Sequence, residues 1–404
     1  MYDTPWRLPL CALLIGILSG CAGLPVSGSI GGQTINTRVD SEVARYYLAN
    51  YLAGKHTNPF LDGLIDRVDR TANGHLPNRA ELKYLSDSFS VDFAALYLAD
   101  QIARVPVNRR FRSAFDQAYE YTRQAFPKGQ MQVPGADNYD VLFVPTYLYK
   151  RFTLTGADMA GPRAALQKVG FTGYFVETRD DGPVELNAEL VMSAIRARAE
   201  SGRRLIVVSA SKSGAEVALA LTKLGPAQTR HVAAWINAVG ALQGTPLVDD
   251  KVMPDIEFIV GKIDPAGAES MTTVRGRQRF ASFHVPKSVL VVNYFGIPTI
   301  GSISFLVRKG FFALRRYGPN DGVVLLSDMI FPGGVTIAQL GSDHIQINDD
   351  IDVAGVALAM TVVGWVQSHD QISPDPANQL RASQPSDILS VGQDLSPNPA
   401  ESSP

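Results

Sequence analysis

The sequence predicts an α/β protein in which a doubly wound, mostly parallel sheet follows an α-helical N-terminal part. From about residue 138 onward, short apolar segments alternate with helical patterns. These segments are almost continuously apolar, as strands buried on both faces of a parallel sheet must be. Before that point, apolar residues recur mainly at helical spacing. A regular succession of strand, helix and strand is typical of doubly wound sheets.

The 404-residue chain begins with a segment that we expect to be a secretory signal. Residues 1–20 contain an apolar run that is too short to span a bilayer. The sequence LSGC at residues 18–21 resembles the lipobox of bacterial lipoproteins, which implies cleavage before Cys21 and a lipid on its sulfur. The alternative is an ordinary signal peptide with an accidental cysteine. Because Cys11 is the only other cysteine, the mature chain would contain no disulfide.

The lipobox resemblance also implies a location in the bacterial cell envelope, with the chain held to a membrane by its lipid. Ala22 follows the cysteine, and the absence of aspartate there favours the outer membrane if the cell is Gram-negative. Residues 21–38 are rich in glycine and serine, so we expect a flexible tether. Residues 371–404 are rich in proline, serine and glutamine, and we expect them to be disordered.

Between these ends we expect two regions, a helical N-terminal subdomain over residues 39–137 and an α/β domain over residues 138–370. The first helix of the subdomain has Ser41 as a candidate N-cap and Gly54 as a candidate C-cap. Helical spacing continues through residues 76–105 and 109–126.

The α/β domain contains six candidate strands separated by helical segments. The segment at 302–318 interrupts this order and is either a lid over a site or an ordinary packed helix. Residues 353–366 are apolar but short, so we expect a buried helix rather than a membrane span. The candidate strands are residues 141–145, 173–178, 204–210, 231–239, 288–295 and 335–340, and the main helical segments are 157–170, 184–202 and 212–225.

A serine-rich turn joins the candidate strand 204–210 to the helix after it. The sequence SASKSG, residues 209–214, resembles the nucleophile elbow of the α/β-hydrolase family, although serines replace both glycines of the usual G-x-S-x-G pattern. The resemblance implies the α/β-hydrolase fold, with Ser211 as the nucleophile. Ser213 is the alternative in a shifted register, and helix capping is the structural alternative.

The same family resemblance implies a histidine base and an acid later in the chain. His344 follows the last candidate strand, where the family places its catalytic histidine. Asp321 lies in an Asp-Gly-Val-Val sequence that resembles the acid-bearing loop of many lipases. Asp264 and Asp328 are the rival acids. The order serine, aspartate, histidine is that of the family.

An oxyanion requires hydrogen-bond donors from the backbone. The resemblance implies the N–H of Lys212, directly after the nucleophile, and a second N–H from the loop after the first strand. Tyr147 is the candidate for this second donor, with Thr146 as the alternative. No metal or organic cofactor is expected.

These residues predict a membrane-anchored serine hydrolase that cleaves a carboxylic ester of a small molecule or a lipid. An acyltransferase with the same triad and a non-catalytic binding lipoprotein are the alternatives. A net charge of −2 without a basic block argues against nucleic-acid binding.

Overall fold

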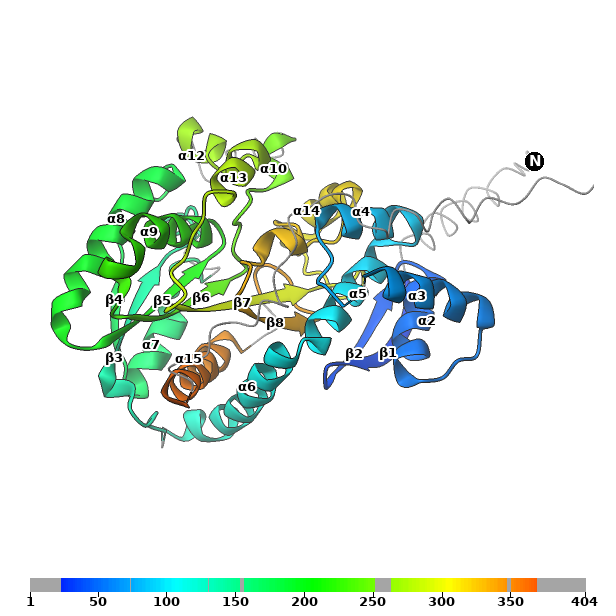
Figure 1. The fold of residues 1–404 in the computed structure, drawn as a ribbon, viewed down its shortest axis with the longest axis horizontal. Coiled ribbons are helices and arrows are strands. Elements are labelled where there is room, and N and C mark those ends of the chain that lie inside the picture. Colours follow the sequence, from blue (N-terminus) through cyan, green and yellow to red (C-terminus); the bar gives the residue numbers. More distant parts are fainter. Residues whose placement is uncertain are drawn as a thin grey trace, which may run out of the picture.

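A six-stranded, fully parallel sheet forms the centre of the computed structural model, which describes residues 23–72, 74–129, 131–152, 156–250, 263–346 and 350–368. The strand order is β4-β3-β5-β6-β7-β8 (Figure 1). All six predicted strands are present, and those at 204–210 and 335–340 begin and end at the predicted residues. The strands are β3 Tyr139–Val144, β4 Thr172–Phe175, β5 Arg204–Ala210, β6 Val232–Ala238, β7 Leu290–Ile297 and β8 Val335–Leu340.

Both faces of the sheet are buried, as the continuous apolar strands require. In β3, Val141 and Phe143 belong to the apolar core on one face, whereas Leu142 and Val144 belong to the core on the other. Helices α6, α7 and α15 cover the first face, and α8 and α9 cover the second (Figure 1). Their bounds are α6 Pro106–Ala125, α7 Ala160–Lys168, α8 Val184–Arg198, α9 Lys212–Thr229 and α15 Ile351–Ser368.

The helix α15 is the only helix in the described part of the chain that is long and apolar enough to cross a membrane. It packs against α6 and α7, and 56% of it is buried inside the protein. This agrees with the buried helix that the sequence predicts.

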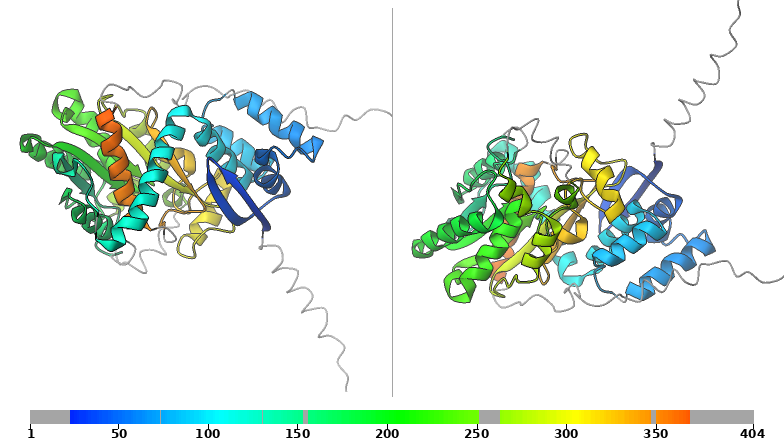
Figure 2. Two further views of the ribbon diagram at one scale, coloured as in Figure 1. Left: turned by 90° about the horizontal axis from the view of Figure 1, so that it is seen from below. Right: turned by 90° about the horizontal axis from the view of Figure 1, so that it is seen from above.

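The N-terminal region is helical as predicted, but it shares its apolar core with one face of the sheet. Ser41 caps the first of its helices by accepting a hydrogen bond from the N–H of Ala44 at 3.2 Å. Both views in Figure 2 place most of this region at one end of the molecule, beyond β8. Its helices before α6 are α2 Glu42–Ala49, α3 Pro59–Ala72, α4 Arg79–Ser88 and α5 Val91–Arg104.

The predicted flexible tether over residues 21–38 is wrong for its larger part. Two antiparallel strands, β1 Leu24–Ile30 and β2 Gln33–Val39, form a hairpin there. The turn is Gly31-Gly32, and both glycines have positive φ. Positive φ at both positions is required in the two-residue hairpin turn whose twist matches that of the flanking strands. Apolar side chains at alternate positions are buried, and this burial offsets the entropy cost of ordering the segment. Cys21, the signal segment and the 371–404 tail lie outside the described residues.

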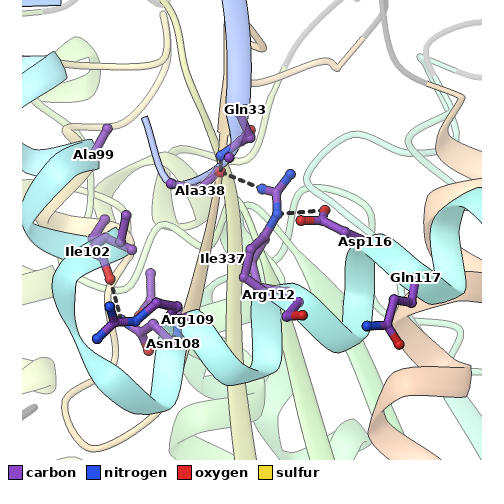
Figure 3. Close-up of a pocket in the computed structure, with 15 residues that line it drawn as sticks. Gln33, Ala99, Ile102, Asn108, Arg109, Arg112, Asp116, Gln117, Ile337 and Ala338 are labelled. Carbon is purple, nitrogen blue, oxygen red and sulfur yellow. Dashed lines mark hydrogen bonds and ion pairs between the residues drawn. The ribbon is translucent and has the colours of Figure 1, made fainter. Parts of the chain in front are cut away.

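The hairpin and α6 cover the free edge of β8 with polar side chains (Figure 3). The side-chain amide of Gln33 donates to the carbonyl of Ala338 at 2.8 Å and accepts from the N–H of Leu340 at 3.0 Å. Arg112 also donates to the Ala338 carbonyl, at 3.1 Å. An exposed edge strand would invite pairing with another chain, so these contacts protect the sheet.

Four short helices lie on the side of the sheet where the strands end (Figure 1). In open α/β sheets this is the side where ligands bind, next to the point at which the strand order reverses. Here the reversal falls between β3 and β5, which are neighbours in the sheet. The helices are α10 Pro246–Asp249, α12 Pro265–Glu269, α13 Thr273–Phe280 and α14 Arg308–Leu314.

Candidate functional site

Ser211 lies in a sharp turn between β5 and α9, with φ 56° and ψ −126°. This backbone conformation is strained for a residue with a side chain, and such strain is often found at functional sites. The loop after β6 holds the turn in place. The N–H of Ser211 donates to the carbonyl of Ala238 at 3.0 Å, and its carbonyl accepts from the N–H of Ala241 at 2.9 Å.

Small residues around the turn allow close packing. A Cβ atom on Gly214 would lie 2.6 Å from the side-chain oxygen of Asn237, and one on Gly240 would lie 1.9 Å from the same oxygen. Neither position therefore tolerates a side chain without a shift of the buried Asn237. The turn depends on glycine at both positions.

The two neighbouring serines, Ser209 and Ser213, are buried and have structural partners. The hydroxyl of Ser213 donates to the carbonyl of Val144 at 2.8 Å and accepts from the N–H of Ala210 at 2.9 Å. The hydroxyl of Ser209 accepts from the indole N–H of Trp235 at 2.8 Å. The shifted register would therefore place the nucleophile in the protein core.

The structure brings Ser211, His344 and Asp321 together, although they are far apart in the sequence. The Nε2 atom of His344 lies 3.0 Å from the Oγ of Ser211. Its Nδ1 atom lies 2.6 Å from the Oδ2 of Asp321. The imidazole thus bridges the hydroxyl and the carboxylate, each at hydrogen-bonding distance.

Asp321 is fully buried and its carboxylate is held by the backbone. Its Oδ1 accepts hydrogen bonds from the N–H groups of Val323 at 2.9 Å and Val324 at 2.7 Å. Its carbonyl accepts from the backbone N–H of His344 at 3.0 Å. Only Oδ2 faces the imidazole, so the acid has one orientation.

The rival acids are engaged elsewhere. Asp264 caps α12 and forms an ion pair with Arg179 at 2.9 Å. Asp328 is fully buried, and this burial raises its pKa to about 7. Ser327 and Arg79 are its partners. Neither carboxylate contacts His344 among the interactions of the described residues.

The remaining described histidines also have partners away from this site. His56 contacts Asp62 and His75 contacts Glu81, both in the N-terminal region. His231 and His284 contact backbone carbonyls. His369 lies outside the described residues.

The loop after β3 contains Tyr147, the predicted second oxyanion donor. The N–H of Thr146 donates to Ala157 at 3.2 Å and that of Leu148 donates to Asp180 at 2.9 Å, so both are engaged. The N–H of Tyr147, between them, has no backbone acceptor among the described residues. The N–H of Lys212 belongs to the first turn of α9, where backbone donors have no partner within the helix.

The side chain of Lys212 forms a buried network that was not predicted from the sequence. It pairs with Glu216 one turn later, and both side chains are only 2% exposed. The amide of Asn187 donates to the same carboxylate oxygen at 2.9 Å. The ammonium also lies 5.8 Å from the centre of the Tyr147 ring, so the network connects the elbow to the loop after β3. The Lys-x-x-x-Glu spacing was the available sequence signal.

A cavity of about 500 Å³ lies elsewhere, at the edge of β8, and contains none of the triad residues. Asn108, Arg109, Arg112 and Asp116 are among the residues that line it (Figure 3). In the described part of the chain no group of three histidine, cysteine, aspartate or glutamate side chains has the arrangement of a metal site.

No family model and no curated protein matches the chain. Among solved structures, a metagenomic carboxyl esterase, MGS0156, is similar with 19% identity and a TM-score of 0.49, over 59% of this chain and 77% of that one. The Bacillus licheniformis lipase BlEst2 in its mature form has 17% identity and a TM-score of 0.44, over 59% and 94%. The phospholipase PlaB from Legionella pneumophila has 17% identity and a TM-score of 0.37, over 48% and 45%.

The parallel sheet, the strained turn after β5 and the serine–aspartate–histidine order together make this an α/β-hydrolase fold.

Proposed function

We propose that this protein is a serine hydrolase that cleaves a carboxylic ester through a covalent acyl-enzyme. The observation that carries the proposal is the hydrogen-bonded chain from Ser211 through His344 to Asp321. A serine hydroxyl is a weak nucleophile until a neighbouring base accepts its proton. His344 is in position to do so.

In the first half of the reaction, the N–H at Nδ1 of His344 donates a hydrogen bond to the Asp321 carboxylate, which leaves Nε2 unprotonated and able to accept a proton. As the Ser211 oxygen attacks the ester carbon, its proton moves to Nε2 and an imidazolium forms beside the Asp321 carboxylate. The imidazolium then donates this proton to the leaving alcohol. The C–O bond breaks, and the acyl group remains on Ser211.

In the second half, His344 removes a proton from a water molecule that attacks the acyl-enzyme. The same proton returns to the Ser211 oxygen as the acid product leaves. The tetrahedral intermediates carry negative charge on the former carbonyl oxygen. The N–H groups of Lys212 and Tyr147 are the proposed donors that stabilise this charge.

The proposed location is the bacterial cell envelope, with a lipid on Cys21 that holds the enzyme at a membrane, the outer membrane if the cell is Gram-negative. The LSGC sequence supports this part of the proposal. A membrane-bound enzyme of this kind would meet esters of lipids and other envelope molecules, and we propose these as its substrate class.

A fluorophosphonate probe tests the chemistry, because it reacts covalently with activated serines. We expect the wild-type chain to be labelled, and both Ser211→Ala and His344→Ala to lose labelling. Ser213→Ala is the matched control and should keep labelling, provided that its thermal unfolding shows a folded protein. Labelling that follows Ser213 instead, or a folded wild type that is never labelled, would overturn the proposal.

A further inference from the structure

We propose that an exposed apolar and basic surface beside the triad binds the surface of an anionic lipid bilayer. This surface consists of Phe305, Leu306, Arg308, Lys309 and Phe312, and we call it the 305–312 patch. It lies on the segment that leads into α14 and on α14 itself. Its binding to lipid is separate from the lipid anchor on Cys21 and from the chemistry of Ser211.

The apolar side chains of the patch are unusually exposed. Phe305 is 89% exposed, Leu306 is 57% exposed and Phe312 is 41% exposed. Their exposure is not a sign of loose packing, because Ile303, Val307 and Phe311 of the same segment are buried in a small apolar cluster. The segment is therefore anchored by one set of apolar residues and presents the other to its surroundings.

The charges of the segment indicate what kind of surface the patch would bind. Residues 302–319 contain four basic residues and no aspartate or glutamate. Arg315 pairs with Asp40 and Arg316 pairs with Asp250. Arg308 and Lys309 are exposed beside the apolar side chains.

Apolar side chains flanked by cations are the pattern that binds an anionic bilayer. Aromatic and aliphatic groups enter the boundary between headgroups and acyl chains, while the cations are attracted to the lipid phosphates. The guanidinium of Arg308 lies 5.8 Å from the centre of the Phe312 ring, so basic and aromatic groups are intermixed within the patch. A neutral protein partner would gain less from the two cations.

The patch lies next to both loops that complete the triad. A Cβ atom on Gly310 would lie 2.1 Å from the carbonyl of Gly322, so α14 packs directly on the loop of Asp321. The N–H of Ser304 donates to the carboxylate of Asp343, the residue before His344, at 2.8 Å. Figure 1 shows α14 on the side of the sheet where the strands end. Docking of the patch would therefore bring the triad close to the membrane surface.

Vesicle binding tests this inference with a chain that begins at Ala22. This chain keeps every described residue and lacks the predicted lipidation site. Its binding would be measured by flotation with phosphatidylcholine vesicles, with and without phosphatidylglycerol. The variants are Phe305→Ser/Leu306→Ser and Arg308→Gln/Lys309→Gln. Phe60→Ser is the matched control, because Phe60 is 71% exposed but lies on α3.

We expect the wild type to bind the anionic vesicles, and the apolar double variant to bind about tenfold more weakly. The Arg308→Gln/Lys309→Gln variant should bind anionic vesicles about tenfold more weakly than the wild type, and its binding should depend much less on salt concentration. Phe60→Ser and Ser211→Ala should bind as the wild type does. Equal unfolding midpoints would show that the variants are folded. Because Ser211→Ala removes the chemistry but not the patch, failure of the hydrolase proposal would not affect this result.

Three outcomes would overturn the inference. The first is a wild type that does not bind anionic vesicles, and the second is an apolar double variant that binds as well as the wild type. The third is a dimer in sedimentation experiments that the Phe305→Ser/Leu306→Ser variant dissociates. In that case the patch is an interface between two copies of this chain.

Discussion

Replacing Lys212 with methionine should destabilise the protein strongly, because the change leaves the carboxylate of Glu216 buried without its cation. Both side chains are 2% exposed, and the second oxygen of Glu216 already has no hydrogen-bond partner. Removing one member of a buried ion pair costs about 3–5 kcal/mol of unfolding free energy. Methionine fills nearly the same volume, so a cavity contributes little to the expected loss.

The double variant Lys212→Met/Glu216→Leu distinguishes the cost of the unpaired buried charge from other effects of replacing Lys212. It removes both charges, and Asn187 keeps its other acceptor, the carbonyl of Arg179 at 3.0 Å. Replacing both members of a buried pair by apolar residues is often neutral or stabilising. We therefore expect the double variant to unfold within about 1 kcal/mol of the wild type.

Urea unfolding followed by far-ultraviolet circular dichroism measures these differences. Lys223→Met is the matched control, because Lys223 and Glu189 form an ion pair with side chains 42% and 55% exposed. Such exposed pairs contribute about 0–1 kcal/mol. A Lys212→Met variant as stable as Lys223→Met, or a double variant no more stable than Lys212→Met, would refute the reasoning.

Two further predictions concern single carboxylates. In Asp321→Asn the amide oxygen must accept from the N–H groups of Val323 and Val324, so the amide NH₂ faces His344 and favours the wrong tautomer of the imidazole. We therefore expect kcat for a p-nitrophenyl ester to fall about 10⁴-fold with KM little changed. A loss of kcat below tenfold would contradict the role assigned to Asp321. Burial and the nearby Asp40 raise the pKa of Asp92 from 3.8 to about 7. In that range the folded state holds a proton that the unfolded state has released, so the unfolding free energy falls as pH rises from about 4 to about 7. Unfolding midpoints at pH 5 and pH 8 should therefore differ less for Asp92→Asn than for the wild type, and equal differences would contradict the prediction.

The sheet was predictable because its strands are short apolar runs with both faces of the sheet covered by helices. Most positions of β5 and β8 are buried, and the bounds of both strands follow from the sequence. The grouping of Ser211, Asp321 and His344 was predictable for a different reason. The resemblance to the α/β-hydrolase family implies these three roles in this order, and the carboxyl ends of parallel strands lie at one edge of the sheet, where such residues can meet.

The hairpin was missed because composition was given more weight than pattern. Residues 24–39 are rich in glycine and serine, yet Val26, Ile30, Ile35 and Val39 are buried on one side of the two strands. The Gly31-Gly32 pair between alternating residues was the signal for a two-residue turn. The buried Lys212 network was missed because lysine and glutamate are rarely buried, and only the packed structure shows that these two are.

The helical N-terminal region shares its apolar core with the sheet and contacts the segments around the triad. It covers the edge of β8 through Gln33, and it also reaches the segment that carries the 305–312 patch. Arg315 donates to Asp40 at 2.5 Å, and the N–H of Ile300 donates to Asp92 at 3.2 Å. These contacts join residues more than 200 positions apart, so no local pattern predicts them. They fix both ends of the segment that packs against the loops of Asp321 and His344, and this gives the region a part in positioning the triad.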